Sequence, residues 1–100
     1  MIISMKKINV AIVGMRFGGA FPEIYKAHPD VGRVVIYDPN IEQSNRVSEK
    51  CGGCEVVTSY EDILNDRDID AIHIISPVPY HEEQQLAALN AGKHCATTIP

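Results

Sequence analysis

The 100-residue sequence lacks several features that mark specialised classes of protein. It has no excess of basic residues, because its formal net charge is −4, and this argues against a nucleic acid partner. No apolar run is long enough to span a bilayer, since Gly, Asp, Lys or Pro interrupts each one, and we expect no membrane partner. There is no internal repeat, linker or low-complexity segment. The hydrophobic share of 45% and charged share of 22% are those of an ordinary globular domain.

The sequence predicts neither a secretory leader nor a full set of metal-binding cysteines. The first apolar run is short and no small-residue cleavage site follows it, which favours a cytoplasmic protein with reduced thiols. Cys51 and Cys54 form a single C-x-x-C, with no second pair to complete a zinc site. The pair follows a predicted helix C-terminus, where the helix dipole does not activate a thiol. We therefore interpret Gly52-Gly53 as a helix C-cap between two half-buried thiols, and predict no metal site.

The sequence does contain a regular alternation of short apolar runs with helical patterns. Strands are predicted at residues 7–13, 34–37, 55–58, 71–75 and 94–97, and helices at 18–28, 39–50, 59–64 and 79–91. In the last helix, Leu86, Ala87 and Leu89 are predicted to face the core. Alternation of this kind produces parallel strands, right-handed crossovers and helices on both faces. The predicted fold class is therefore α/β, a doubly wound parallel sheet of the Rossmann type with five strands present.

Such a domain usually has a sixth strand, and the sequence stops directly after the fifth. We therefore expect residues 1–100 to be the dinucleotide-binding N-terminal part of a longer protein.

The stretch VAIVGMRFGG resembles the glycine fingerprint G-x-G-x-x-G of a dinucleotide-binding turn. Gly14 takes the first glycine position and Gly19 the third, while Arg16 replaces the second. The second glycine normally allows the backbone to approach a pyrophosphate, so the Cβ of Arg16 takes up scarce room. Its guanidinium could instead fold over the phosphates and form charge-assisted hydrogen bonds. An ordinary strand-to-helix turn is the alternative reading of this stretch.

Asp38 ends the second predicted strand, close to the ~20-residue spacing at which the fingerprint expects an acid for the adenosine ribose. A carboxylate there repels a 2′-phosphate and favours NAD over NADP, although Arg16 could pair with such a phosphate. The alternative role of Asp38 is a helix N-cap followed by Pro39 at the first helical position. The two roles can coexist.

A second candidate segment is ISPVPYH, residues 75–81, at the carboxyl end of the fourth predicted strand. In a doubly wound sheet this strand lies beside the first, at the switch point where ligands bind. Ser76 and Pro77 would end the strand and expose backbone groups to the crevice. His81 falls in the first turn of the following helix, where a purely structural histidine is the simpler reading.

Four pieces in order resemble the N-terminal domain of the glucose–fructose oxidoreductase, inositol dehydrogenase and rhizopine catabolism family, Gfo/Idh/MocA. They are VAIVGMRFGG, VVIYDPN, SYEDILNDRDIDAIHIISPVPYH and ALNAGKHCATTIP. The resemblance implies an NAD-dependent or NADP-dependent dehydrogenase that transfers a hydride to or from a sugar, cyclitol or related polyol. It further implies a C-terminal α/β domain, absent from this sequence, that supplies most of the substrate pocket and a homo-oligomer interface.

The resemblance also implies roles for individual residues. The pyrophosphate would lie on Gly14, Met15, Arg16, Phe17 and Gly18, the adenosine ribose on Asp38, and the nicotinamide near Ser76, Pro77, His81 and Thr98. The family's Glu-Lys-Pro is replaced by Thr98-Ile99-Pro100, and isoleucine cannot serve the acid–base role of that lysine. The catalytic residues are therefore left unassigned. The alternative function is an NAD-binding module or sensor without catalysis.

Overall fold

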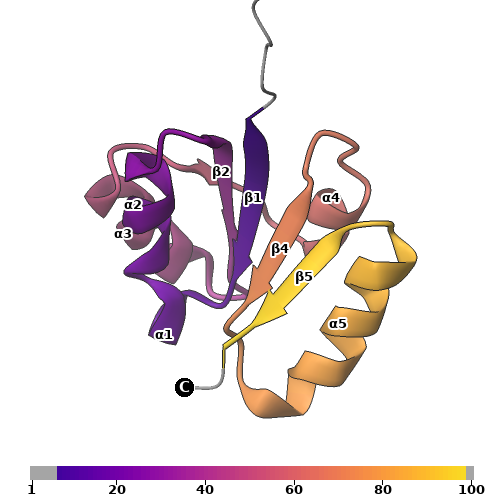
Figure 1. Cartoon of the computed structure of the whole chain (residues 1–100). Helices are drawn as coiled ribbons and strands as arrows, with labels where there is room; N and C mark the ends of the chain where they lie inside the picture. Colours follow the sequence, from indigo (N-terminus) through magenta and orange to yellow (C-terminus); the bar gives the residue numbers. More distant parts are fainter. Residues whose placement is uncertain (1–6, 99–100) are drawn as a thin grey trace, which may run out of the picture.

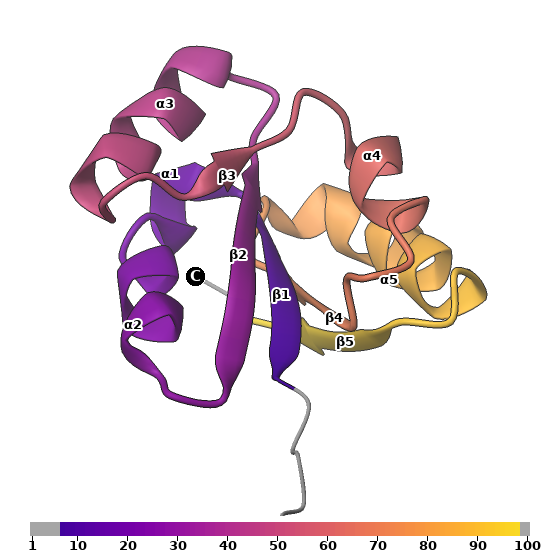
Figure 2. The ribbon, with the colours of Figure 1, turned by 90° about the horizontal axis from the view of Figure 1, so that it is seen from above.

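The computed structural model describes residues 7–98, which form a five-stranded parallel sheet between two layers of helices (Figures 1 and 2). The strands are β1 (Ile8–Val13), β2 (Val31–Tyr37), β3 (Glu55–Val56), β4 (Ala71–Ile74) and β5 (His94–Thr97). Their order is β3-β2-β1-β4-β5, and every neighbouring pair is parallel. The chain therefore winds outward from β1 in both directions, which confirms the predicted doubly wound fold.

Helices α1 (Met15–Gly18), α2 (Phe21–Ala27) and α3 (Ile41–Lys50) lie on one face of the sheet (Figure 2). The other face carries α4 (Tyr60–Leu64) and α5 (His81–Asn90), the latter preceded by the 3₁₀ turn η1 (Val78–Tyr80). Each face has its own apolar core. On the first, Met15 and Val47 pack against the strands, and on the second Ile63 and Ala88 do so. The alternation of side chains along β1 supplies both cores, which is why residues 10–13 are a continuous apolar run.

The helix predicted at residues 18–28 is in fact two helices, α1 and α2. The first begins a turn earlier than predicted, directly after Gly14, and the chain bends at Gly19 and Ala20 before α2. A Cβ on Gly19 would lie 2.9 Å from the Met15 carbonyl oxygen and 3.3 Å from a methyl of Val47. The absence of a side chain at Gly19 thus allows the chain to bend tightly after α1, and allows α1 to pack against α3.

The predicted core face of α5 is wrong for its two leucines, while Ala87 is half-buried. Leu86 and Leu89 are 54% and 60% exposed, whereas His81 and Ala88 are buried. Ala88 allows the helix to approach the sheet, and polar side chains beside it have hydrogen-bond partners. One such contact is the Gln85 side-chain amide, which donates to the Thr97 hydroxyl at 2.7 Å. The helix is therefore oriented by hydrogen bonds as well as by apolar burial.

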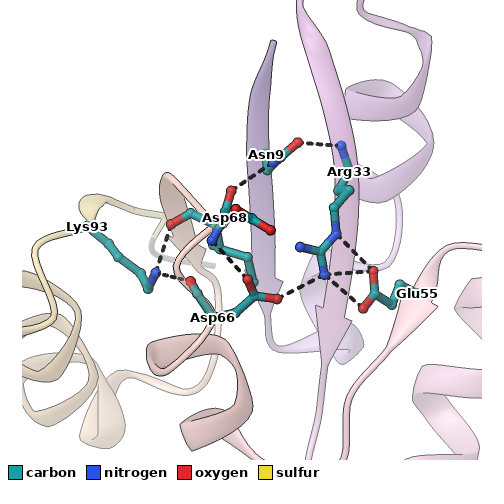
Figure 3. Close-up of polar contacts among 7 residues, drawn as sticks. Asn9, Arg33, Glu55, Asp66, Asp68 and Lys93 are labelled. Atoms are coloured by element: carbon teal, nitrogen blue, oxygen red, sulfur yellow. Dashed lines mark hydrogen bonds and ion pairs between the residues drawn. The ribbon is translucent and has the colours of Figure 1, made fainter. Parts of the chain in front are cut away.

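Polar side chains connect the elements at the amino ends of the strands (Figure 3). Asn9 at the start of β1 donates to the Asp68 carbonyl at 2.7 Å and accepts from the Arg33 backbone N–H at 2.8 Å. The Arg33 guanidinium contacts the carboxylates of Glu55 and Asp66, each at 2.9 Å. This holds the pKa of the Asp66 carboxyl below its ordinary value. The loop between α4 and β4 is thereby attached to β1, β2 and β3.

Among residues 7–98, no helix is long and apolar enough to cross a bilayer. Ile99 and Pro100, on which the predicted loss of the family lysine depends, lie outside the described residues.

Candidate nucleotide site at the carboxyl edge of the sheet

The strand register brings the predicted site residues together at one edge of the sheet. Val13, the last residue of β1, pairs with Tyr37 of β2 on one side and Ile74 of β4 on the other. The residues that follow these strands therefore meet, and they surround a cavity of about 630 Å³. Five predicted site residues line it, namely Gly14, Arg16, Asp38, Ser76 and Pro77. This is the switch point between the two halves of the sheet, where doubly wound folds bind ligands.

Gly14 fits this position because a side chain has no room there. Its φ is +99°, a conformation that residues with a Cβ rarely adopt. A Cβ would lie 2.6 Å from the Ser76 nitrogen and 2.7 Å from its Cα, closer than real atoms approach. The Gly14 N–H donates to the Tyr37 carbonyl at 2.9 Å, so the turn is held between β2 and the segment after β4.

The Asp38 carboxylate joins the two sides of the cavity. One oxygen accepts from the Met15 N–H at 2.8 Å, and the other accepts from the Asn40 N–H at 2.8 Å. The alternative prediction that Asp38 caps the following helix is wrong, because α3 begins at Ile41. Its N-cap is Asn40, which accepts from the Gln43 N–H at 3.2 Å. Asp38 instead fixes the start of α1 while still lining the cavity.

Ser76 and His81 form a buried hydrogen-bonded pair at the end of β4. The His81 Nε2 contacts the Ser76 carbonyl oxygen, which requires the Nε2–H tautomer, and the Ser76 hydroxyl donates to Gln84. His81 is 7% exposed and lies outside the lining of the cavity, so it acts on the cavity by holding the Ser76 backbone. Gly14 packs against that same backbone.

Three side chains that sequence reasoning did not connect form a hydrogen-bonded series on the α2 face of the sheet. The Tyr25 hydroxyl lies 2.8 Å from His73 Nδ1, and His73 Nε2 lies 2.6 Å from the Thr98 hydroxyl. The Phe21 ring packs edge-on against the imidazole, with ring centroids 4.8 Å apart. The available signal was the histidine inside the apolar strand AIHI, because a buried polar side chain needs partners.

Burial lowers the pKa of His73 below its ordinary value of about 6.5. The unfolded chain then binds the proton more readily than the folded chain, so the free energy of unfolding should decrease as pH falls below about 6.5. Urea unfolding between pH 7.5 and 5 would measure this slope. His73→Gln should have a shallower slope than the parent chain, and equal slopes would contradict the assignment.

The prediction of reduced thiols is wrong for two of the three cysteines. Cys51 and Cys54 are joined by a disulfide, while Cys95 is free and half-buried. The C-cap of α3 is Cys51 and not the predicted Gly52-Gly53, although the helix does end at these glycines, which follow the cap with φ of +85° and +97°. This tight turn brings the two Cα atoms to 6.2 Å, within the range that a disulfide can bridge. Among the described residues, no cluster of three or more His, Cys, Asp or Glu side chains could hold a metal ion.

Comparison with known proteins identifies relatives of this fold and site. A family model described as an oxidoreductase family with an NAD-binding Rossmann fold matches residues 8–97. Inositol 2-dehydrogenase 1 of Mycolicibacterium vanbaalenii is 32% identical over 89% of this chain and 26% of its own length. The 4-carboxy-2-hydroxymuconate-6-semialdehyde dehydrogenase of Sphingobium sp. is 33% identical over 93% of this chain and 30% of its own.

Solved structures agree with these relatives. A levoglucosan dehydrogenase in complex with NADH and L-sorbose superposes with a TM-score of 0.81 at 29% identity, covering 93% of this chain and 27% of that one. An NAD-binding protein from Listeria innocua superposes with a TM-score of 0.84 at 30% identity, over 96% and 27% of the two chains. The chain thus spans between a quarter and a third of the length of these relatives.

Proposed function

The chain belongs to the Gfo/Idh/MocA oxidoreductase family, with its NAD-binding Rossmann fold, and we propose that it is the nucleotide-binding domain of a two-domain dehydrogenase. The whole protein transfers a hydride between a nicotinamide cofactor and a carbon of a sugar, cyclitol or related polyol. Inositol and levoglucosan dehydrogenases among the relatives support this substrate class. The second domain supplies most of the substrate pocket and the homo-oligomer interface, and the protein works in the cytoplasm.

Asp38 carries the proposal, because its carboxylate stands at the carboxyl end of β2 and lines the cavity. We assign it to the hydroxyls of the adenosine ribose. Its two oxygens already accept from backbone N–H groups, and each keeps a lone pair for a ribose hydroxyl. A fixed negative charge at this point repels a 2′-phosphate, so NAD is the proposed cofactor and NADP the alternative.

The remaining assignments follow the path of the dinucleotide along the edge of the sheet. The turn formed by Gly14, Met15, Arg16, Phe17 and Gly18 holds the pyrophosphate, and the Arg16 side chain, which lines the cavity, clamps it. Ser76, Pro77 and Thr98 lie toward the nicotinamide, and His81 acts through the Ser76 carbonyl. The bound nicotinamide accepts or supplies the hydride, while this chain binds and orients it.

Calorimetric titration with NADH tests the proposal. Asp38→Asn removes the charge and one acceptor, and we expect NADH affinity to fall about 10-fold to 100-fold, as for a lost charge-assisted hydrogen bond. Glu49→Gln on the exposed end of α3 is the matched control, because it removes the same charge away from the cavity. Unchanged affinity in Asp38→Asn would contradict the ribose assignment. Tighter binding of NADPH than NADH would assign Arg16 to a 2′-phosphate.

A second candidate function is a nucleotide-binding module without catalysis. Ile99 supports it, because this residue stands where the family has its lysine. The two functions differ in one measurement. Reduction of NAD by inositol or levoglucosan, followed by absorbance with the whole protein, supports the dehydrogenase, whereas NADH binding without turnover of any polyol supports the module.

A further inference from the structure

The hydrogen-bonded series of Tyr25, His73 and Thr98 ends at the same edge of the sheet as the candidate site. Tyr25 comes from α2 and His73 from the middle of β4, and Thr98 directly follows β5. The Thr98 N–H donates to the Ile74 carbonyl at 3.0 Å, which fixes its backbone beside the end of β4. Two residues after Ile74, beyond the end of β4, is Ser76, which lines the cavity. The Thr98 hydroxyl is thus the end of the series nearest to the candidate site.

The series can carry its hydrogens in only two ways when the imidazole is neutral, because one ring nitrogen donates and the other accepts. In the first, the Tyr25 O–H donates to Nδ1 and Nε2–H donates to the Thr98 oxygen. In the second, both donations are reversed. A phenol is a much stronger acid than an aliphatic hydroxyl and therefore the better donor to a ring nitrogen. This difference favours the first arrangement, in which the hydrogen of the Thr98 hydroxyl remains free for an acceptor outside the series.

We propose that Tyr25 and His73 are positioning residues that turn the Thr98 hydroxyl into a hydrogen-bond donor toward an oxygen on the nicotinamide half of the cofactor. The acceptor is the carboxamide carbonyl or a hydroxyl of the adjoining ribose, both of which accept from a neutral hydroxyl. His73 is 7% exposed and packed edge-on against Phe21, so the imidazole is held in one orientation. This inference rests on the proposed nucleotide-binding function. It adds Tyr25 and His73 to that function, and all three residues of the series lie beside the cavity and not in its lining.

Comparing NADH with ADP isolates the nicotinamide half, because ADP keeps the adenosine and the two phosphates but lacks the nicotinamide nucleoside. We expect Thr98→Val and His73→Leu to weaken NADH binding about 10-fold, the effect of one lost hydrogen bond in a buried site, and to leave ADP binding unchanged. Tyr25→Phe removes the donor that fixes the tautomer and should weaken NADH less. Thr58→Val, an exposed threonine before α4, is the matched control.

A conservative substitution of His73 distinguishes a positioning role of its imidazole from a packing role. The His73→Gln amide can accept from Tyr25 and donate to Thr98, so we expect its NADH affinity within about threefold of the parent chain. If His73 had a merely structural role, His73→Gln and His73→Leu would have the same affinity for NADH, or both would bind ADP as well as NADH more weakly. Either result would overturn the proposal.

A spectroscopic measurement tests the direction of the series without any ligand. The ¹⁵N–¹H spectrum of the His73 imidazole should show a proton on Nε2 and none on Nδ1 at neutral pH, and the opposite tautomer would overturn the proposal. The proposed nucleotide site and the proposed positioning role of Tyr25 and His73 would be contradicted by different results. If Asp38→Asn weakens NADH and ADP but Thr98→Val changes neither, the positioning inference is wrong and the nucleotide site stands. If NADH does not bind the parent chain, both fall.

Discussion

Replacing Gly14 by alanine should lower the free energy of unfolding by about 3 kcal/mol or more, through two separate costs. The first is conformational, because the φ of +99° at Gly14 is unfavourable for any residue with a Cβ. The second is steric, because the new methyl would lie 2.6 Å from the Ser76 nitrogen and 2.8 Å from the Ile75 carbonyl carbon. Both are backbone atoms, so no side chain can rotate away, and β1 and the end of β4 must separate.

Gly53→Ala is the matched control for Gly14→Ala. Gly53 has nearly the same φ, +97°, but apart from its chain neighbours no atom of residues 7–98 lies within 4 Å of where its Cβ would be. It therefore carries the conformational cost alone, about 1 kcal/mol. Urea unfolding of both variants, with the parent chain, measures the difference. Equal destabilisation would show that the contact with Ser76 relaxes easily, and that the turn at the candidate site is looser than the structure indicates.

The fold was predictable because the information that sets it is local and periodic. The five apolar runs of the sequence correspond to the five strands, and Ser59 caps α4 as predicted, accepting from the Asp62 N–H at 3.3 Å. Gly14 and Asp38 were also predictable as cavity residues, since each follows a strand directly and the carboxyl ends of parallel strands meet. A glycine and an aspartate at these two positions then indicated a dinucleotide-binding site at this edge of the sheet.

Features that depend on distant partners could not be predicted. His73 is joined to Tyr25 and Thr98, which are far from it in the sequence, and no local pattern connects the three. The exposed face of α5 was missed for a related reason. Hydropathy ranks leucine above glutamine and histidine for burial, but it does not register that the side chains of Gln85 and His81 have hydrogen-bond partners. The disulfide was missed because pairing depends on how the turn after α3 folds.

Lys93 is the clearest case of such a distant partner, and its replacement by methionine should be strongly destabilising. The side chain is 6% exposed, and its Nζ donates to the carbonyl oxygens of Asp66 at 2.6 Å and Ile69 at 2.8 Å (Figure 3). These carbonyls belong to the loop between α4 and β4. Methionine fills a similar volume but removes both hydrogen bonds. The Asp66 oxygen keeps only the Ile69 N–H, at 3.2 Å, and the buried Ile69 oxygen loses its lysine donor, at a cost of about 2–4 kcal/mol.

Lys26→Met is the control for Lys93→Met, because it removes a lysine whose contact with a backbone carbonyl is exposed and not buried. Lys26 also donates to a backbone carbonyl, that of Gly52 at 3.3 Å, but the contact is exposed. Water replaces the lost donor there, so we expect a change below about 0.5 kcal/mol. Urea unfolding of the two variants gives the comparison. If Lys93→Met were as mild as Lys26→Met, the loop carbonyls would have to find water or new donors. The loop would then be held mainly by its contacts with Asn9 and Arg33, of which the half-exposed ion pair of Arg33 with Asp66 contributes only about 0–1 kcal/mol.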